Sequence, residues 1–425
     1  MTAETIYALS SGSPPAAIAL VRISGPRAAA ALEALTGKRP EPRVATLAAV
    51  RGADGERLDT ALALLFPGPA SATGEDVAEL HLHGGRAVVA AVLGALSALE
   101  GLREARPGEF TRRAFENGRI DLAEAEGLAD LLEAETESQR RAALAMAGGA
   151  IGRRVGAWQA RLLALAAGLE AMIDFSDEGE VGEALPPGWP EAVAALTAEM
   201  QAALARPPAE RLKEGVRVVI AGPPNSGKSS LLNYLAGREA AITSAMAGTT
   251  RDVIEAPTAI GGTPFLLVDT AGLREAADEV EAIGVGRARD SLAGADLVLW
   301  LGPPADCPAR ERALIVQSKI DVAPRDSEAE LHVSAETGEG MEALAAAVVA
   351  RARSLLPLEG ESAFNRRQLA SVAAACQALS KGRWDDPILA AEALRAAGAA
   401  LDTVTGRAGV EDMLDALFGR FCIGK

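Results

Sequence analysis

The sequence predicts an α/β fold combined with an α-helical domain, and three observations carry that prediction. Residues 1–116 alternate short apolar strands with helical stretches and are punctuated by Pro and Gly, as in a compact α/β unit. Residues 117–212 and 357–425 are helical stretches rich in Ala, Leu, Glu and Arg. Residues 213–356 alternate strands and helices, which indicates a mostly parallel sheet.

These segments are most simply arranged as one helical domain interrupted by an inserted domain. At 425 residues the chain has room for about three domains. Residues 357–425 alone would have little core, so we expect them to pack with residues 117–212. Two separate helical pieces are the alternative that the sequence leaves open. The predicted division is 1–116, 117–212, 213–356 and 357–425.

Apolar runs and turn residues predict individual elements. In the N-terminal segment we expect strands at 18–23, 61–66 and 78–83 and helices at 27–35 and 87–99. In the inserted segment we expect strands at 216–221, 264–268 and 313–316, with a helix from Ser230 to Leu235.

Charge and composition exclude several classes of protein. The chain has 42 Lys+Arg against 58 Asp+Glu, and its net charge of −16 argues against nonspecific binding along nucleic acid. No run of about 18 apolar residues predicts a membrane span, and residues 1–11 lack the basic segment of a secretory signal. The three cysteines are far apart and odd in number, so we expect no disulfide framework or zinc cluster, and a cytoplasmic location.

Gly222-Pro-Pro-Asn-Ser-Gly-Lys-Ser229 has the pattern of a phosphate-binding loop. It follows an apolar run and precedes a helical one, which is the strand–loop–helix context that the pattern requires. The glycines let backbone N–H groups curl around phosphate oxygens. Lys228 supplies charge to the β- and γ-phosphates, and Ser229 offers its hydroxyl to Mg²⁺. A Gly-rich turn before an ordinary helix is the structural alternative.

Two later segments complete a magnesium site. Asp269, in Val268-Asp-Thr-Ala-Gly272, ends an apolar run and can reach Mg²⁺ through water. Gly248-Thr-Thr-Arg-Asp252 lies between this segment and the phosphate loop, and either threonine hydroxyl can join the metal shell when a γ-phosphate is present. We assign Mg²⁺ to Ser229 and Thr250.

Ser318-Lys-Ile-Asp321 and Val333-Ser-Ala-Glu336 predict which base is bound. Asp321 can accept two hydrogen bonds from the N1–H and 2-amino group of guanine, which adenine cannot offer. Lys319 can lay its aliphatic stem along the base. Because the five segments follow one another in the order of a GTPase domain, the nucleotide is GTP. Ser318 stands where Asn is usual, and its shorter side chain predicts weaker nucleotide binding, with guanine still selected.

The residues expected to contact GTP are therefore spread over five segments. They are Asn225, Ser226, Gly227, Lys228, Ser229 and Ser230; Ser244, Ala245, Met246, Ala247, Gly248, Thr249 and Thr250; Asp269, Thr270, Ala271 and Gly272; Ser318, Lys319 and Asp321; and Ser334 and Ala335.

Several further motifs belong to one family. They are Arg22-Ile-Ser-Gly25, Gly74-Glu-Asp-Val77, Glu79-Leu-His-Leu-His-Gly-Gly85, Arg106-Pro-Gly-Glu-Phe-Thr-Arg112, Glu116-Asn-Gly-Arg-Ile-Asp-Leu122 and Phe421-Cys-Ile-Gly-Lys425. With the segments above, they make the chain resemble the MnmE (TrmE) family of tRNA-modifying GTPases along its whole length. The resemblance implies a folate-binding N-terminal domain that forms a homodimer, a helical domain and an inserted P-loop GTPase domain.

The resemblance also implies a reaction. With a partner flavoprotein, MnmG (GidA), which carries FAD, the family adds a carboxymethylaminomethyl or aminomethyl group at C5 of the wobble uridine (U34) of certain tRNAs. The one-carbon unit comes from 5,10-methylene- or 5-formyl-tetrahydrofolate. Hydrolysis of GTP depends on Mg²⁺, is stimulated by K⁺ and is accompanied by dimerisation of the GTPase domains.

The resemblance assigns the hydrolytic groups as well. This chain has Leu273 where Ras-type GTPases have the Gln that orients water, and the family uses a Glu further along, which is Glu281 here. On the residues alone the neighbouring acids are equal candidates. A K⁺ ion takes the place of an arginine finger and neutralises developing charge. Its implied ligands are Asn225, Ser244, Met246 and Thr249. For Asn225, a loop residue that tolerates positive φ is the alternative.

A folate site is implied in the N-terminal domain. A carboxylate suits the guanidine-like edge of the pterin, and cations suit the glutamate carboxylates of folate. Arg119 replaces a usual Lys, which keeps the charge and changes the geometry. A competing interpretation is a metal trio of Glu79, His81 and His83, which alternate along one strand. The implied folate residues are Arg22, Glu79, Arg119 and Lys425.

Cys422 lies four residues from the C-terminus, where a prenylation box would place it. Lys425 is a poor last residue for that box, and no polybasic stretch precedes it. The resemblance instead places Cys422 near the modification centre, with a nucleophilic role as one interpretation.

A second class of function is a ribosome-assembly or regulatory GTPase of the Era/EngA type, without folate chemistry. Such proteins carry an RNA-binding KH unit or a second GTPase domain. Gly406-Arg-Ala-Gly409 has the GxxG spacing of a KH loop, but its surroundings are helical. The sequence contains no second phosphate loop.

Overall fold

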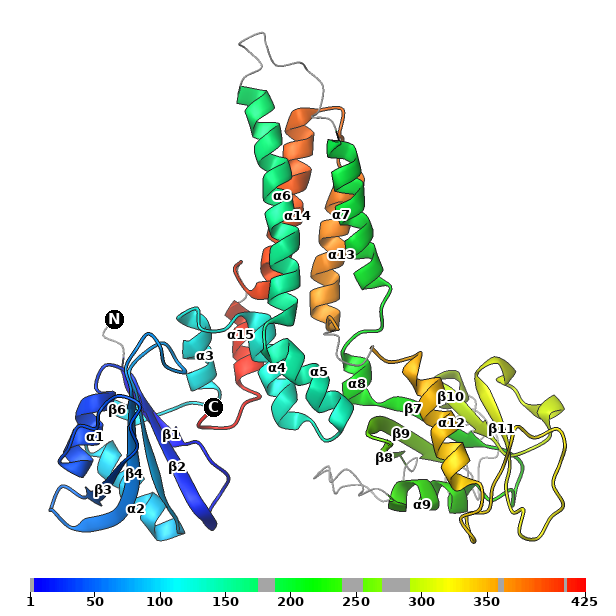
Figure 1. The fold of residues 1–425 in the computed structure, drawn as a ribbon, viewed down its shortest axis with the longest axis horizontal. Helices are drawn as coiled ribbons and strands as arrows, with labels where there is room; N and C mark the ends of the chain where they lie inside the picture. The colour runs from blue at the N-terminus through cyan, green and yellow to red at the C-terminus, as the bar shows by residue number, and fades with distance from the viewer. Residues whose placement is uncertain (1–3, 175–187, 239–254, 270–290, 358–362, 409–410) are drawn as a thin grey trace, which may run out of the picture. The chain divides into compact units, whose positions relative to one another are not determined.

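A computed structural model describes residues 4–174, 188–238, 255–269, 291–357, 363–408 and 411–425. The chain forms two compact units, a first unit of residues 1–129 and 405–425 and a second unit of residues 130–404. One sheet lies in the blue part of the ribbon and another in its green-to-yellow part, and long helices make up much of the rest (Figure 1). The predicted combination of α/β and α-helical structure is confirmed.

The first unit is built on a six-stranded sheet with the order β3-β4-β5-β2-β1-β6. Neighbouring strands are antiparallel except β1 and β6, which are parallel. Helices α1 (Ala28–Thr36) and α2 (Arg86–Ser97) share a core with alternate strand residues such as Val21 and Leu80. The strands are β1 (Thr5–Leu9), β2 (Ala16–Ser24), β3 (Thr46–Arg51), β4 (Arg57–Phe66), β5 (Val77–Gly84) and β6 (Leu102–Glu104).

The predicted N-terminal elements match this structure closely. The strands expected at 18–23, 61–66 and 78–83 lie within β2, β4 and β5, and the two expected helices differ from α1 and α2 by one or two residues at their ends. Strands β1, β3 and β6 were not predicted. In β3 one face is exposed although apolar, with Leu47 66% exposed, so its alternation gives a weak signal.

A small second core in the first unit joins segments far apart in sequence. Helix α15 (Glu411–Phe418) packs against α3 (Glu109–Glu116), and the beginning of α4 (Leu122–Glu133) contributes to the same core. Buried apolar side chains from α4, α15 and the C-terminal tail meet there, and Phe115 of α3 packs against them. The buried side chains are Leu122, Ala125, Ala129, Leu414, Leu417, Phe418 and Phe421.

Two glycines allow the C-terminal segment to approach this closely. A Cβ on Gly108, whose φ is +68°, would lie 2.2 Å from the carbonyl oxygen of Phe418. A Cβ on Gly424, whose φ is +98°, would lie 2.1 Å from the carbonyl oxygen of Leu9. Any other residue would both strain the backbone and clash, so these glycines hold the tail against α3 and the end of β1.

Four helices of the second unit lie along one another: α6 (Ala150–Asp174), α7 (Trp189–Leu204), α13 (Arg366–Lys381) and α14 (Pro387–Thr405) (Figure 1). Helix α13 packs on α7. Gln159 of α6 donates a hydrogen bond to Asp402 of α14 over 2.7 Å. The segments before and after the inserted sheet therefore pack together, while the residue boundaries of the predicted four-part division remain a prediction.

The second sheet has six strands in the order β12-β11-β10-β7-β9-β8. Neighbouring strands are parallel except β8 and β9, so the prediction of a mostly parallel sheet is confirmed. Helices α9 (Lys228–Arg238) and α12 (Met341–Arg353) share its main core. The strands are β7 (Val216–Ala221), β8 (Glu255–Ile260), β9 (Thr263–Asp269), β10 (Leu297–Trp300), β11 (Ala313–Gln317) and β12 (Leu331–His332).

A search of the described residues finds no helix that is both long and apolar enough to cross a membrane.

Candidate functional site

The phosphate loop connects β7 to α9, as its sequence pattern predicts. Gly222 has a φ of +153°, and a Cβ there would lie 2.8 Å from the carbonyl oxygen of Leu301, so the loop begins where the backbone passes β10 closely. Lys228 is largely buried, and its Nζ donates a hydrogen bond to the carbonyl oxygen of Pro223 over 2.8 Å. This bond folds the lysine side chain back over its own loop. The ammonium group therefore lies where the loop curls around phosphate oxygens.

Ser229, in the first turn of α9, meets Asp269 at the carboxyl end of β9. The hydroxyl of Ser229 donates a hydrogen bond to Oδ2 of Asp269 over 2.7 Å, and Asp269 is buried at the end of β9. A hydroxyl beside a buried carboxylate is a donor set of oxygens that suits Mg²⁺. The predicted proximity of these two residues is thus present, while Thr250 lies outside the described residues.

A cavity of about 660 Å³ lies beside the phosphate loop and holds the residues predicted to bind the base. Its lining includes Ser318, Lys319 and Asp321 from the turn after β11, together with Ser334 and Ala335. Gly227 and Ser230 close it on the phosphate side. The cavity therefore continues directly from the phosphate loop, as one nucleotide requires.

Two hydrogen bonds tie the base-reading turn to the phosphate loop. The hydroxyl of Ser318 donates to the carbonyl oxygen of Ser226. Lys319 has a φ of +58°, and its Nζ donates to the carbonyl oxygen of Asn225 over 2.8 Å. Ser318 thus makes the kind of link for which an Asn is usual, although with a single donor. Asn225 itself has a φ of +61°, so the loop-residue alternative describes its backbone correctly and leaves its role toward K⁺ a prediction.

Asn233 and Tyr234 of α9 also line this cavity and were not predicted. Both lie on the helix that follows the phosphate loop, where the sequence offers no signal beyond the helical period. A Cβ on Gly338 would lie 3.1 Å from the Tyr234 hydroxyl, so the ring stands against the loop before α12.

Several predicted residues lie outside the described residues. They are the K⁺ ligands Ser244, Met246 and Thr249, the water-positioning Glu281, and Ala245, Ala247, Gly248, Thr250, Thr270, Ala271 and Gly272.

In the first unit, Arg22 and Glu79 face each other on β2 and β5. The Nε of Arg22 donates to Oε1 of Glu79 over 2.9 Å, and the guanidinium lies 5.9 Å from the ring centre of Phe110. The Nε2 of His81 is buried without a hydrogen-bond partner, 3.5 Å from Oε2 of Glu79. A carboxylate, a guanidinium and an unsatisfied imidazole nitrogen fit the polar edge of a pterin.

The other two predicted folate residues lie in the same unit. Arg119 is exposed, and its side chain lies against the turn at Gly74, three residues before β5. The approach of Gly424 to Leu9 brings Lys425 to the end of β1, where Leu9 pairs with Val21 of β2. Among the described contacts, neither residue bonds to the Arg22–Glu79 pair.

The alternative of a metal trio on β5 is wrong. The Nδ1 of His83 pairs with Oδ1 of Asp59 over 2.7 Å, away from Glu79 and His81. No group of three or more His, Cys, Asp or Glu side chains that could hold a metal occurs among the described residues.

The Cys422 side chain is exposed, and its backbone carbonyl accepts hydrogen bonds from the N–H groups of Gly108 and Lys425. These bonds fix the tail beside the start of α3.

Comparison with known proteins agrees along the whole chain. A family model described as "GTP-binding protein TrmE N-terminus" matches residues 5–119, and one described as "MnmE helical domain" matches residues 122–422. The tRNA modification GTPase MnmE of Rhizorhabdus wittichii is 59% identical over 428 residues, 99% of this chain and 97% of that protein. The protein of the same name from Novosphingobium aromaticivorans is 56% identical over 435 residues, 99% of this chain and 100% of that one.

A solved structure gives a weaker likeness. The G domain of the T. maritima FeoB iron transporter is 26% identical and matches 32% of this chain and 98% of that chain, with a TM-score of 0.25. At that score it adds no argument.

The phosphate loop, the Ser229–Asp269 pair and the adjoining cavity lined by Ser318, Lys319 and Asp321 together define a P-loop GTPase domain. With both family models matched and full-length relatives more than half identical, the chain belongs to the MnmE family of tRNA modification GTPases.

Proposed function

We propose that this chain hydrolyses GTP as an enzyme of tRNA modification, acting on the wobble uridine. The observation that supports nucleotide binding is the single cavity lined both by Asp321 and by Gly227 of the phosphate loop. Asp321 selects guanine because it accepts from N1–H and the 2-amino group. Lys228 and the loop N–H groups hold the phosphates, and Ser229 with Asp269 would hold Mg²⁺, which neutralises charge on the β- and γ-oxygens.

Hydrolysis further requires a positioned water and neutralisation of the charge that develops. We propose that Glu281 positions the attacking water. We propose that a K⁺ ion, held in part by Asn225, neutralises the charge that develops on the phosphates. An alkali cation among the phosphate oxygens stabilises the transition state as a guanidinium would. Asn225 supports this assignment because it lies in the phosphate loop with its carbonyl fixed by Lys319.

The proposed role in tRNA modification rests on family membership and on the side chains of the first unit. There, tetrahydrofolate would bind between the Arg22–Glu79 pair and the C-terminal tail, and Cys422 would lie near the reacting carbon. The proposed partner is a flavoprotein of the MnmG type that carries FAD. The chain would act as a homodimer in the cytoplasm. The product would carry a carboxymethylaminomethyl or aminomethyl group at C5 of U34. No observation favours an Era/EngA-type function without folate.

The test is the state of the wobble uridine in cells. Deletion of the gene should remove the C5 group from the affected tRNAs, and the wild-type chain should restore it, as read by mass spectrometry of digested tRNA. Lys228→Ala should fail to restore it because phosphate binding is lost. Full modification in the deletion strain would contradict the proposal.

The folate assignment has a separate test. Full-length protein should bind 5-formyl-tetrahydrofolate in calorimetry, and Glu79→Gln should weaken binding roughly tenfold or more, because hydrogen bonds to a charged group are lost. Arg57→Ala, an exposed change at the start of β4, should leave binding unchanged. Equal affinity in Glu79→Gln would remove Glu79 from the site.

A further inference from the structure

The first turn of α5 (Glu137–Ala147) is bonded at two separate points to segments that directly precede strands of the second sheet. Gln139 donates from Nε2 to the carbonyl oxygen of Leu212 over 2.9 Å. Ser138 donates to the carbonyl oxygen of Gly262 twice, from its hydroxyl over 2.9 Å and from its backbone N–H over 3.3 Å. We call these four residues, Ser138, Gln139, Leu212 and Gly262, the α5 joint.

Gln139 both caps the start of α5 and bonds to Leu212. Its Oε1 accepts from the backbone N–H groups of Glu135 and Thr136, each over 2.9 Å, while the Thr136 hydroxyl accepts from the Gln139 N–H. This capping box fixes the start of α5, and the remaining amide group is the one that reaches Leu212. One side chain therefore holds the start of a helix and the contact to the sheet in a single geometry.

Each of the two contacts adjoins a strand that runs to the proposed nucleotide site. Leu212 is buried in the main core of the sheet and lies in α8 (Glu210–Glu214), directly before β7, which ends in the phosphate loop. Gly262 lies in the turn between β8 and β9, and β9 ends at Asp269, the partner of Ser229. The joint thus contacts the near ends of two adjacent strands whose far ends hold phosphate and magnesium ligands.

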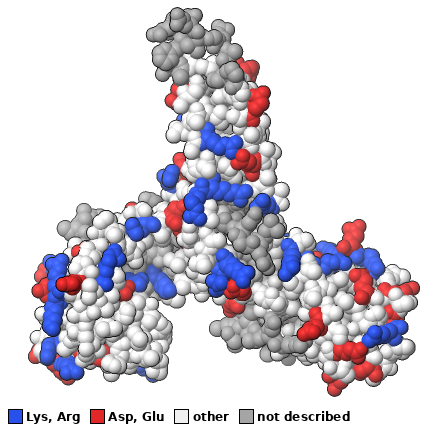
Figure 2. All heavy atoms as spheres, viewed as in Figure 1, with Lys and Arg blue, Asp and Glu red and all other residues white. Residues whose placement is uncertain are grey.

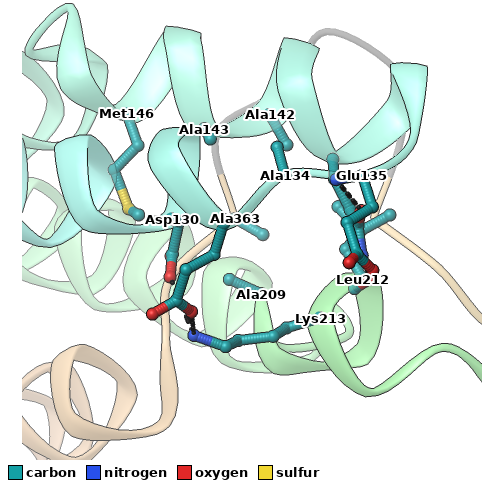
Figure 3. A pocket seen from close by; sticks show the side chains of 12 residues that line it. Asp130, Ala134, Glu135, Ala142, Ala143, Met146, Ala209, Leu212, Lys213 and Ala363 are labelled. Atoms are coloured by element: carbon teal, nitrogen blue, oxygen red, sulfur yellow. Dashed lines mark hydrogen bonds and ion pairs between the residues drawn. The ribbon is translucent and has the colours of Figure 1, made fainter. Parts of the chain in front are cut away.

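Packing at the joint is incomplete on one side. A cavity of about 290 Å³ lies beside it, lined by Ala142, Ala143 and Met146 of α5 and by Ala209 and Leu212 (Figure 3). At its rim Lys213 forms ion pairs with Glu133 and Asp130. Hydrogen bonds and ion pairs surround the cavity, but its interior is not close-packed. Elements around such a space can shift with little loss of van der Waals contact.

We propose that the α5 joint couples occupancy of the nucleotide site to the helical part of the second unit, with Gln139 and Ser138 as positioning residues. The proposal rests on the proposed binding of guanine nucleotide. A nucleotide that draws the phosphate loop and Asp269 together moves β7 and β9 relative to each other. The joint passes that movement to α5, and the cavity gives α5 and α8 room to follow.

The experiment measures hydrogen–deuterium exchange in the full-length protein without nucleotide, with Mg²⁺–GDP and with Mg²⁺ and a hydrolysis-resistant GTP analogue. Gln139→Glu is the informative variant, because its carboxylate still accepts the capping bonds and cannot donate to Leu212. Ser138→Ala removes the hydroxyl that donates to Gly262 and lies 3.3 Å from the Thr136 hydroxyl, and it keeps the backbone N–H bond to Gly262. Arg140→Gln is the matched control, since it removes only an exposed ion pair to Glu137 on the same helix.

In the wild type and in Arg140→Gln, nucleotide should change exchange in α5 by roughly fivefold or more, as a coupling free energy of ordinary size requires. In Gln139→Glu that change should fall severalfold while protection of residues 222–229 by nucleotide persists, and Ser138→Ala should show a smaller decrease. Nucleotide protection at 222–229 without any change in wild-type α5 would overturn the coupling, as would an unaltered change in Gln139→Glu. Absence of protection at 222–229 would instead overturn the proposed function.

Discussion

Asp321 is exposed and lines the cavity beside the phosphate loop. The turn that carries it is tied to the phosphate loop by hydrogen bonds from Ser318 and Lys319. Asp321→Asn should lower GTP affinity roughly ten- to a hundredfold, since hydrogen bonds to a charged group contribute about 1.5–3 kcal/mol. Discrimination against ATP should fall with it. Glu336→Gln removes the same charge from the same cavity and should change affinity little. Titration calorimetry checks both, and equal losses in the two variants would mean that Asp321 acts only through its charge.

Ser318 makes the link to Ser226 with its single O–H donor, whereas an Asn side chain offers two N–H donors and reaches further. Ser318→Asn should therefore tighten GDP binding several-fold, about the contribution of one further hydrogen bond. The measurement is the dissociation constant of a fluorescent guanine nucleotide. Unchanged or weaker binding would show that the serine link is already sufficient.

Gly108 lies where the C-terminal tail packs against the start of α3. Gly108→Ala and Gly118→Ala both place a Cβ at a φ near +65°, which costs about 1–2 kcal/mol in either case. Gly118 faces open space, whereas Gly108 faces the backbone of Phe418. Gly108→Ala should therefore destabilise the first unit by a further ~1–3 kcal/mol, because the overpacked tail must move. Calorimetric unfolding measures the difference, and equal losses would mean that the tail contact is easily displaced.

The ion pairs of Glu109, in α3, with Arg103 and Arg113 predict that the stability of the first unit depends on pH. Burial raises the pKa of Glu109, but hydrogen bonds from Arg103, the Arg106 N–H and Arg113 outweigh it and lower the pKa to about 2. A carboxyl whose folded pKa lies below its unfolded value contributes stability above the unfolded pKa, and that contribution is lost as the pH falls through the folded one. We expect a loss of about 2 kcal/mol between roughly pH 4.5 and pH 2, which is less than the full pKa shift corresponds to because solvent screens the partly exposed carboxylate.

The control for this prediction is a variant pair. Glu109→Gln should remove that part of the pH slope, as measured by calorimetry from pH 6 to pH 2. Glu137→Gln breaks pairs to Arg140 and Arg141 that are exposed to solvent, and should leave the slope unchanged. An identical slope in the wild type and Glu109→Gln would contradict the assignment.

Some residues of the site could be predicted from the sequence, and others could not, for physical reasons. The phosphate loop and Asp321 could be predicted because phosphate and guanine impose fixed residue types at short spacings. Tyr234 could not, because its helix position carries no chemical signature. The bond from Ser138 to Gly262 joins residues 124 positions apart, and a hydroxyl bonded to a backbone carbonyl leaves no pattern in either segment. The metal trio of Glu79, His81 and His83 was only a competing interpretation, and strand alternation does not show that His83 pairs with Asp59 of the neighbouring strand.

For the whole molecule, the charge distribution limits how RNA can be bound. Acidic and basic residues are interspersed over the face shown in Figure 2, in keeping with a net charge of −16. Because the net charge is negative, we expect contact with tRNA to be local or shared with the proposed flavoprotein partner. The nucleotide site and the proposed folate site lie in different compact units, which makes coupling between them a property of the entire chain.

The central claim is that a bound alkali cation completes the GTPase site. Its most direct test is steady-state GTP hydrolysis by the full-length protein in K⁺ and in Na⁺ at equal ionic strength, for the wild type and Asn225→Ala. We expect the wild type to be at least roughly tenfold faster in K⁺, because Na⁺ does not supply the same transition-state neutralisation, and Asn225→Ala to lose this preference. Equal rates in the two salts for the wild type would contradict it.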